Sequence, residues 1–515
     1  MADLIKLMHI PAPWEDHQSG RPLPNGFDSV KDAWNNNHDL FSHTFGGADR
    51  AIDALDISGP ASDIDNGAAS PHIKFNVYVD SFDDLQIAIE TAHRPIHIFF
   101  AASGYLDWSR PLHIKDRQDV TIDFKLQDIS IKYDNAPLIV ISRCERLLIR
   151  GLSAPLLDDC RIAIDNSNDV ALIGCALHDY SSRAVTILGT CNRILIDKCS
   201  FLGSSDAVID ATGEICKLAI TRCNFHNSAR DVQTGDASCI QIKGALSARG
   251  YETDPSALGL ELDRDALLMR HPTHAYVVEC NFTLESGSAL RCARAAGIWF
   301  ERNNVGGSSH EAVRIEQYVY GLIVSDNRLN LHPSSRPKAL INIIDTAFYY
   351  IFRNNFDMHQ GVGIKIEGSS GGGIVALNNF VYDAADRAEG IAIVVATPVD
   401  QSFLSQTFIL NSIRGSSRVG FRFETPLPRL FLFDNHIFGT WEWSIESLAP
   451  QPMLTSLNNW SLCQSLNVPL SQRLIRTPPT VRRHDRDVPV QDERTATVAS
   501  GTDAEAQPSG GISQA

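Results

Sequence analysis

One repeated segment limits the folds that this sequence can adopt. Within residues 194–230, the run 194–201 recurs as 218–225, so that Cys199 and Cys223 lie 24 positions apart. Similar short runs of Ile, Val, Leu and Phe continue along the chain from Val120, each followed by a small or polar residue. Because the runs have strand-like composition and a period of about 24 residues, each repeat is expected to form one rung of a β-solenoid.

The repeats align at one junction position. It is occupied by Gly151, Cys175, Cys199, Cys223, Cys280, Asn303, Asn327, Asn354, Asn378, Asn411, Asn435 and Asn458. Stacked asparagines predict a ladder of amide hydrogen bonds, and stacked cysteines inside apolar runs predict buried free thiols. Since the L-x-x-L-x-L pattern of leucine-rich repeats is absent and a propeller blade needs about 40 residues, we expect a right-handed parallel β-helix of about 12 rungs.

The chain divides into three predicted parts. Residues 1–70, rich in Pro, Asn, Asp and Gly, read as an extended or poorly ordered arm, and 476–515 read as a disordered tail. Residues 71–475 form the β-helix. Near its start, Ser81 and Asp84 resemble a capping box, so a helix is expected to reach Ala92 and cover the open end of the solenoid.

Charge and hydropathy exclude several classes of function. The net charge of -16 argues against a nucleic-acid partner. No run of about 20 apolar residues predicts a membrane span, and residues 1–25 lack the apolar core of a Sec signal peptide. A protein that acts outside the cell would therefore leave it by another route; otherwise a cytoplasmic or virion-associated location is expected.

Three aspartates beside the repeat are candidate metal ligands. They are Asp197, Asp206 and Asp210. Clustered carboxylates repel one another and favour a hard cation such as Ca²⁺. In a fully extended strand Asp206 and Asp210 would lie about 13 Å apart, so they converge only if the chain bends. The alternative is that each aspartate caps a turn or faces solvent. The insertion at 243–274 is next to this segment and is expected to add to a binding face.

The segment 194–230 resembles polysaccharide lyase family 1, the pectate lyases. That family carries W-I-D-H-C-S-F, D-G-L-x-D and T-I-S-x-x-x-F-x-x-H-x-K segments, to which residues 195–201, 206–210 and 219–230 are similar. A later R-x-P-R-x-R element ahead of H-x-x-N-N is similar to 291–294 ahead of 301–304. The resemblance covers roughly residues 80–305.

The resemblance implies a Ca²⁺-dependent lyase of an acidic polysaccharide. By it, Asp197, Asp206 and Asp210 would hold calcium. Arg291 would take the position of the proton-abstracting arginine, Arg294 would accompany it, and Arg230 would replace a substrate-contacting lysine. The chain departs from the family pattern at Lys198, Ala207 and Ala293 and lacks the third arginine.

Two other functions stay open from the residues. One is a non-catalytic glycan-binding or structural β-helix, such as a virion spike or adhesin, and the other is a glycoside hydrolase that uses two acids. A monomer or a trimer is compatible with each of these.

Overall fold

The computed structural model describes most of the chain between residues 75 and 467. The described ranges are 75–92, 95–100, 106–124, 129–131, 136–155, 161–180, 183–203, 207–227, 237–244, 274–285, 287–307, 311–317, 319–331, 339–382, 390–397, 405–415, 417–427, 429–440, 442–451, 454–457, 459–461 and 466–467. The predicted arm 1–70, the predicted tail 476–515 and most of the insertion 243–274 lie outside them. No helix among the described residues is long and apolar enough to cross a membrane.

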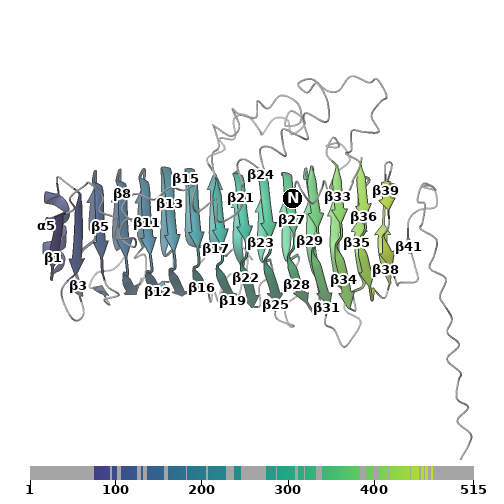
Figure 1. The fold of residues 1–515 in the computed structure, drawn as a ribbon, viewed down its shortest axis with the longest axis horizontal. Helices are drawn as coiled ribbons and strands as arrows, with labels where there is room; N and C mark the ends of the chain where they lie inside the picture. The colour runs from purple at the N-terminus through teal and green to yellow at the C-terminus, as the bar shows by residue number, and fades with distance from the viewer. Residues whose placement is uncertain are drawn as a thin grey trace, which may run out of the picture. The chain divides into compact units, whose positions relative to one another are not determined.

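The described residues form a parallel β-helix, which confirms the predicted fold class (Figure 1). Each rung contributes three successive strand segments, which we call the A, B and C strands. The A and B strands make up most of a 27-stranded sheet, and the C strands form a 12-stranded sheet, so the solenoid has about 12 rungs. Neighbouring rungs pair in parallel, as between β18 and β21, where Ala275 pairs with Ile298.

The strand bounds follow this three-part rung. The A strands are β4 (Leu112–Lys115), β7 (Ile139–Ser142), β10 (Ile162–Asp165), β17 (Ser238–Gly244), β20 (Ser288–Ala293), β23 (Val313–Glu316), β26 (Ile341–Ile344), β29 (Val362–Glu367), β32 (Ile391–Ala396), β35 (Val419–Phe423), β38 (Trp443–Ser447) and β41 (Leu466–Asn467). In two rungs one bent strand supplies both the A and the B segments, namely β13 (Val185–Asp197) and β15 (Ala207–Thr221).

The B strands are β2 (Ile96–Phe100), β5 (Gln118–Asp123), β8 (Glu145–Arg150), β11 (Asn168–Ile173), β18 (Ala275–Val278), β21 (Ala296–Glu301), β24 (Val319–Ser325), β27 (Thr346–Phe352), β30 (Gly373–Ala376), β33 (Gln406–Ile409), β36 (Leu430–Phe433) and β39 (Leu454–Leu457). Two short strands, β3 (Leu106–Trp108) and β6 (Ile129–Ile131), pair with each other.

The C strands are β9 (Ser153–Pro155), β12 (Ala176–Tyr180), β14 (Ser200–Gly203), β16 (Asn224–Asn227), β19 (Asn281–Leu284), β22 (Asn304–Gly307), β25 (Arg328–Leu331), β28 (Asn355–Met358), β31 (Asn379–Tyr382), β34 (Ser412–Gly415), β37 (His436–Phe438) and β40 (Trp460–Ser461). Their apolar side chains stack from rung to rung, with ring centroids 4.9 Å apart for Phe201 and Phe225 and 4.8 Å apart for Phe225 and Phe282.

A single left-handed residue makes each corner between the B and C strands. These residues have positive φ and are Gly151, Gly174, Lys198, Arg222, Glu279, Arg302, Asp326, Arg353, Leu377, Leu410 and Asp434. The left-handed conformation reverses the chain within one residue, at some cost for side chains other than glycine. The residue that follows each corner points into the core and forms the predicted ladder.

The ladder is confirmed from Cys175 to Asn435, but the predicted register is wrong at both ends. Ala176 pairs with Ser153, so Leu152 rather than Gly151 is the equivalent of Cys175. At the other end Asn435 donates its side-chain amide to Asn459 at 2.8 Å, so Asn459 rather than Asn458 continues the ladder. At Gly151 the predicted alignment is one residue early, because the left-handed corner residue precedes the buried one.

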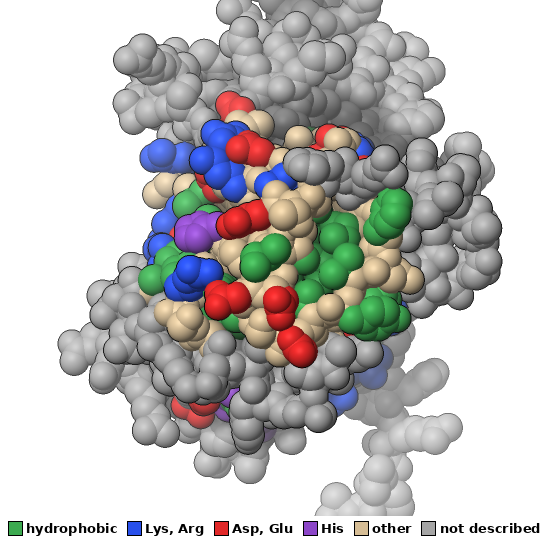
Figure 2. Space-filling model, turned by 90° about the vertical axis from the view of Figure 1, so that its left-hand side faces the viewer, with side chains coloured by type: hydrophobic (Ala, Val, Ile, Leu, Met, Phe, Trp, Pro, Cys, Tyr) green, Lys and Arg blue, Asp and Glu red, His purple; other side chains and the backbone are tan. Residues whose placement is uncertain are grey.

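A helix covers the first end of the solenoid, as predicted. Helix α5 (Phe82–Thr91) begins after Ser81, whose side chain accepts a hydrogen bond from the Asp84 amide. It packs on β1 (Phe75–Val79), β3 and β4. Its buried face includes Phe82, Leu85 and Ile89. Figure 2, which looks onto this end, shows hydrophobic side chains grouped together with acidic side chains beside them.

Candidate functional site

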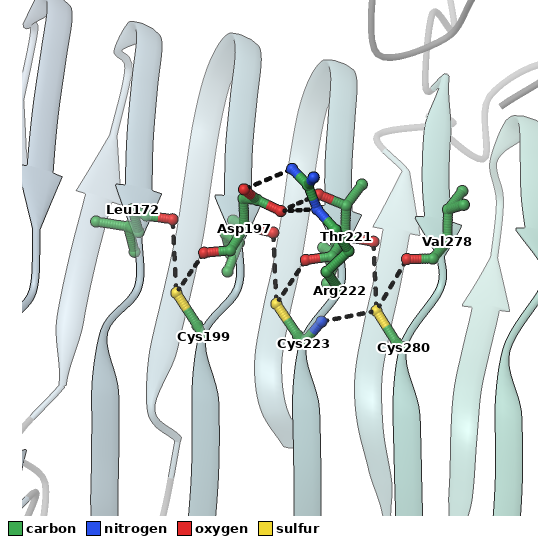
Figure 3. A network of polar contacts seen from close by, with 10 residues as sticks. Leu172, Asp197, Cys199, Thr221, Arg222, Cys223, Val278 and Cys280 are labelled. Carbon is green, nitrogen blue, oxygen red and sulfur yellow. Dashed lines mark hydrogen bonds and ion pairs between the residues drawn. The ribbon is translucent and has the colours of Figure 1, made fainter. Parts of the chain in front are cut away.

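Asp197, a predicted calcium ligand, is the last residue of β13 and lies on the outer side of the B strands. Its carboxylate accepts two hydrogen bonds from the Arg222 guanidinium, each 2.7 Å long, and one of 2.8 Å from the Thr221 hydroxyl. Its side chain is only 6% exposed. The two-point contact with arginine satisfies this carboxylate within the protein. Figure 3 shows it above the cysteine ladder.

Asp210 lies on the outer side of the A strands instead. It falls between Ile209 and Ala211, which both face the core. Its carboxylate accepts a hydrogen bond from the Thr212 hydroxyl at 3.0 Å and forms an ion pair with Arg183 at 3.0 Å. Asp210 is 4% exposed, so this second predicted ligand is also a buried, paired carboxylate.

The fold places Asp197 and Asp210 in neighbouring rungs and on different faces of the solenoid. Asp210 pairs in register with Thr186, near the start of β13, whereas Asp197 lies 11 positions further along, past the bend. The described residues hold no group of three or more His, Cys, Asp and Glu side chains that could bind a metal. Asp197 and Asp210 therefore do not fit a shared calcium site. Asp206 lies outside the described residues, as does Arg230.

A row of polar side chains follows the outer side of the A strands, one per rung. We call it the A row; its members, each paired in register with the next, are Thr186, Asp210, Gln241, Arg291, Arg314, Asn342 and Lys365. The flanking residues of each strand, such as Leu290 and Cys292 beside Arg291, face the core. Strand alternation thus places Arg291, a residue predicted to act in catalysis, on the same face as Asp210.

Five side chains in three adjacent rungs of this face form a network, which we call the A cluster. Its members are Arg291, Glu311, Arg314, Glu316 and Asn342. The Glu316 carboxylate accepts from Arg291 through one oxygen, with Nε at 2.8 Å and Nη2 at 2.7 Å, and from Arg314 Nε through the other at 2.9 Å. Arg314 also approaches Glu311 at 3.6 Å, and the Asn342 amide donates to Glu311 at 3.0 Å.

The A cluster is largely buried although it lies on the outer side of the sheet. Glu311, Glu316 and Asn342 are 6%, 8% and 6% exposed. Among the described residues the Asn342 Oδ1 atom, which is buried, has no hydrogen-bond partner. Since buried polar atoms are almost always hydrogen-bonded, this oxygen is an exception within the A cluster.

Arg294, the second predicted catalytic arginine, is separate from the A cluster. It occupies a left-handed corner between β20 and β21, with φ of 53°. Its backbone amide donates to the Gln317 carbonyl, and its side chain is exposed. The structure therefore brings only Arg291, of the predicted arginines it describes, together with other charged side chains.

Sequence reasoning missed Glu311, Arg314 and Glu316. One signal was present: Arg314 follows Arg291 by 23 positions, which is one repeat, and Glu316 lies two residues further on the same side of the strand. Aligning charged residues by the repeat period would have placed Arg314 and Glu316 beside Arg291.

Comparison with known proteins shows distant similarity to several solved structures. A surface adhesin of Streptococcus pneumoniae is similar over 71% of this chain and 94% of its own, at 11% identity and a TM-score of 0.41. An endo-xylogalacturonan hydrolase from Aspergillus tubingensis is similar over 76% and 95%, at 9% identity and a TM-score of 0.30. A periplasmic alginate epimerase is similar over 75% and 84%, at 12% identity and a TM-score of 0.34.

These similarities are too distant to assign a function. No protein-family model and no curated protein sequence matches the chain.

Proposed function

We propose that this protein acts on an acidic polysaccharide bound along the A row, and that the A cluster is its reaction site. One observation carries the proposal: two guanidiniums, Arg291 and Arg314, are held side by side in adjacent rungs by one buried carboxylate. Arginine binds carboxylates through two parallel hydrogen bonds.

The reaction that best uses such a site is β-elimination. In it a general base takes the C5 proton next to the uronate carboxylate, and the bond from C4 to the glycosidic oxygen breaks as a double bond forms between C4 and C5. The departing oxygen takes up a proton and becomes a hydroxyl of the other fragment. Cationic groups on the carboxylate stabilise the charge that develops there. Because Arg291 donates to Glu316, we propose that it stabilises charge and does not accept the proton.

Calcium dependence stays a separate prediction. Asp197 already accepts hydrogen bonds from Arg222. Asp210 lies on the outer side of the A strands and forms an ion pair with Arg183. Of the two described residues named for the metal, Asp210 is the one that shares a face with Arg291, two rungs away along the A row. We derive no reaction step through the ion.

Hydrolysis is the second candidate, and a specific contact favours it. Glycoside hydrolases use two carboxylic acids on either side of the scissile bond. In the A cluster, Glu311 and Glu316 both contact the Arg314 guanidinium, at 3.6 and 2.9 Å. A pair of buried acids is therefore present in the same place.

The test is incubation of the purified protein with polygalacturonate and with alginate. β-Elimination gives products with the ultraviolet absorbance of an unsaturated uronate, and hydrolysis gives new reducing ends without that absorbance. Arg291→Ala is expected to lower the rate by about 100-fold or more. Arg414→Ala, on the exposed side of β34, is the matched control and should leave it unchanged.

The outcomes separate the candidates. Loss of absorbance after chelation would support calcium. Glycan binding without any turnover would favour the adhesin-like alternative, and neither binding nor turnover with any polyuronate would overturn the proposal.

A further inference from the structure

Two positive charges in adjacent rungs repel each other, so a further group must hold them together before they can form a binding site. Arg291 and Arg314 are register partners in neighbouring parallel strands, and such strands lie about 4.8 Å apart. Like charges in directly opposed cross-strand positions repel each other. The side chains of Arg291 and Arg314 are 19% and 25% exposed, so water screens the repulsion only in part.

Glu316 offsets this repulsion because each of its two carboxylate oxygens accepts hydrogen bonds from a different arginine. Oε1 receives both Nε and Nη2 of Arg291, and Oε2 receives Nε of Arg314. Glu316 lies on the same strand as Arg314, two residues on, so strand alternation directs both to the outer side. Its side chain is 10% exposed, and its hydrogen bonds hold one guanidinium on each carboxylate oxygen.

Glu311 differs from Glu316 although it carries the same charge in the same cluster. Its closest contact with Arg314 is 3.6 Å, longer than a hydrogen bond, and its shorter contact is the 3.0 Å bond from Asn342. Glu311 therefore contributes charge near one arginine, whereas Glu316 orients two.

We propose that Glu316 is a positioning residue that aligns the Arg291 and Arg314 guanidiniums so that together they bind the carboxylates of an acidic polysaccharide. The inference rests on the proposed function for the identity of the ligand. It adds that orientation, rather than net positive charge, limits binding at this site.

Charge and orientation predict opposite effects for one substitution. Glu316→Gln removes a negative charge beside the site, so a site limited by charge would bind a polyanion more tightly. A site limited by orientation would bind it more weakly, because the new amide N–H faces a guanidinium that can only donate. Glu311→Gln removes the same charge and is the matched control.

The experiment measures binding of a hexagalacturonate and a hexamannuronate by calorimetry at low and moderate salt. We expect Glu316→Gln to weaken binding by about tenfold or more, Glu316→Asp to fall between it and the wild type, and Glu311→Gln to bind equally or more tightly. In turnover assays, we expect Glu316→Gln to lower kcat and to raise KM. An unchanged thermal unfolding midpoint would confirm that the variant is folded.

Each result decides between the two ideas. Tighter binding by Glu316→Gln, or equal effects of Glu316→Gln and Glu311→Gln, would overturn the positioning role while leaving the proposed function intact. Absence of binding by the wild-type protein is the different outcome that overturns the proposed function. Should Glu316→Gln not fold, Glu316→Asp carries the same comparison.

Discussion

The two halves of the core ladder are built from different side chains that use the same backbone acceptors. In the cysteine rungs the Cys199 thiol lies 3.5 Å from the Leu172 carbonyl, across one rung. In the asparagine rungs the Asn327 amide donates to the equivalent carbonyl of Phe300 at 2.9 Å. Each ladder residue therefore binds the end of the B strand in the preceding rung.

The two halves differ in the acceptor that each ladder side chain provides for the backbone N–H of the ladder residue in the preceding rung. Asn303, Asn327 and Asn354 form a chain in which the backbone N–H of one residue donates to Oδ1 of the next, at 2.8 and 3.1 Å. Cys223 has only the Cys280 sulfur, at 3.5 Å, for the same N–H. Since sulfur is a weak acceptor and the thiol a weak donor, the asparagine half carries a continuous polar ladder and the cysteine half depends on apolar packing.

The largest expected effect comes from breaking the asparagine ladder. Asn354→Ala removes the acceptor of both the Asn327 backbone N–H and its side-chain amide, and it frees the Val324 carbonyl. Buried groups without partners cost about 1–3 kcal/mol each, so a loss of roughly 3–5 kcal/mol is expected. Cys199→Ala should cost about 1 kcal/mol. Guanidinium unfolding midpoints measure both, and equal losses would contradict the comparison.

An exchange at the boundary between the halves should have a smaller effect. At present the Cys280 N–H donates to Asn303 Oδ1 at 2.9 Å. Asn303→Cys replaces this oxygen with sulfur and is expected to cost about 1–2 kcal/mol. Cys280→Asn offers an oxygen to the Cys223 N–H and should be neutral or stabilising. A destabilising Cys280→Asn variant would show that space, and not hydrogen bonding, fixes the cysteine half.

The third comparison concerns two carboxylates on the outer side of the B strands. Asp197, in a cysteine rung, is paired with Arg222, whereas Glu301, in the first asparagine rung, lies no closer than 3.9 Å to Arg302. Burial raises the pKa of Glu301 above its ordinary value of 4.5, against the opposing effects of Arg302 and Trp299.

A raised carboxyl pKa lowers stability as the pH rises. The folded state then holds the Glu301 proton more firmly than the unfolded state, so the stabilising contribution is complete below pH 4.5 and is lost as the pH rises through the folded pKa. Each unit of elevation corresponds to about 1.4 kcal/mol. Glu301→Gln should therefore gain in unfolding midpoint relative to the wild type between acidic and neutral pH, and a constant difference would contradict this.

The smallest effect concerns thiol reactivity. Desolvation raises the pKa of the buried Cys223 thiol, and burial also raises that of Cys216, which is only partly buried. Thiolate is the reactive form. In native protein we expect iodoacetamide to label Cys216 before any described ladder cysteine, as mass spectrometry of peptides would reveal. Early labelling of Cys199 or Cys223 would show that the cysteine rungs open locally.

The repeat period was sufficient to predict the solenoid and most of its ladder, and the capping box at Ser81 and Asp84 predicted the helix at the first end. The candidate site was harder because its contacts cross rungs. Asp197 is satisfied by Arg222, 25 positions away, through a left-handed corner that no glycine marks. The bend that separates Asp197 from Asp210 lies within the continuous strand β13, so the sequence does not show that they occupy different faces.

The partner of Arg291 was equally hard to predict from the sequence. Its position on an outer face followed from strand alternation, but its partner Glu316 lies 25 residues on, and nothing local links the two. Insertions also change the number of residues between rungs. The partner of an outer side chain is thus known only once the register of the neighbouring rung is known.

The order of these parts along the chain matters for synthesis. Helix α5 and the cysteine rungs precede the asparagine rungs, so they leave the ribosome first. The early rungs can bury their apolar side chains against the helix as each one is completed, without waiting for a distant partner, because each rung contacts mainly its neighbours. The asparagine ladder is then added onto a surface that is already folded, where the backbone N–H of Cys280 donates to Oδ1 of the first asparagine, Asn303.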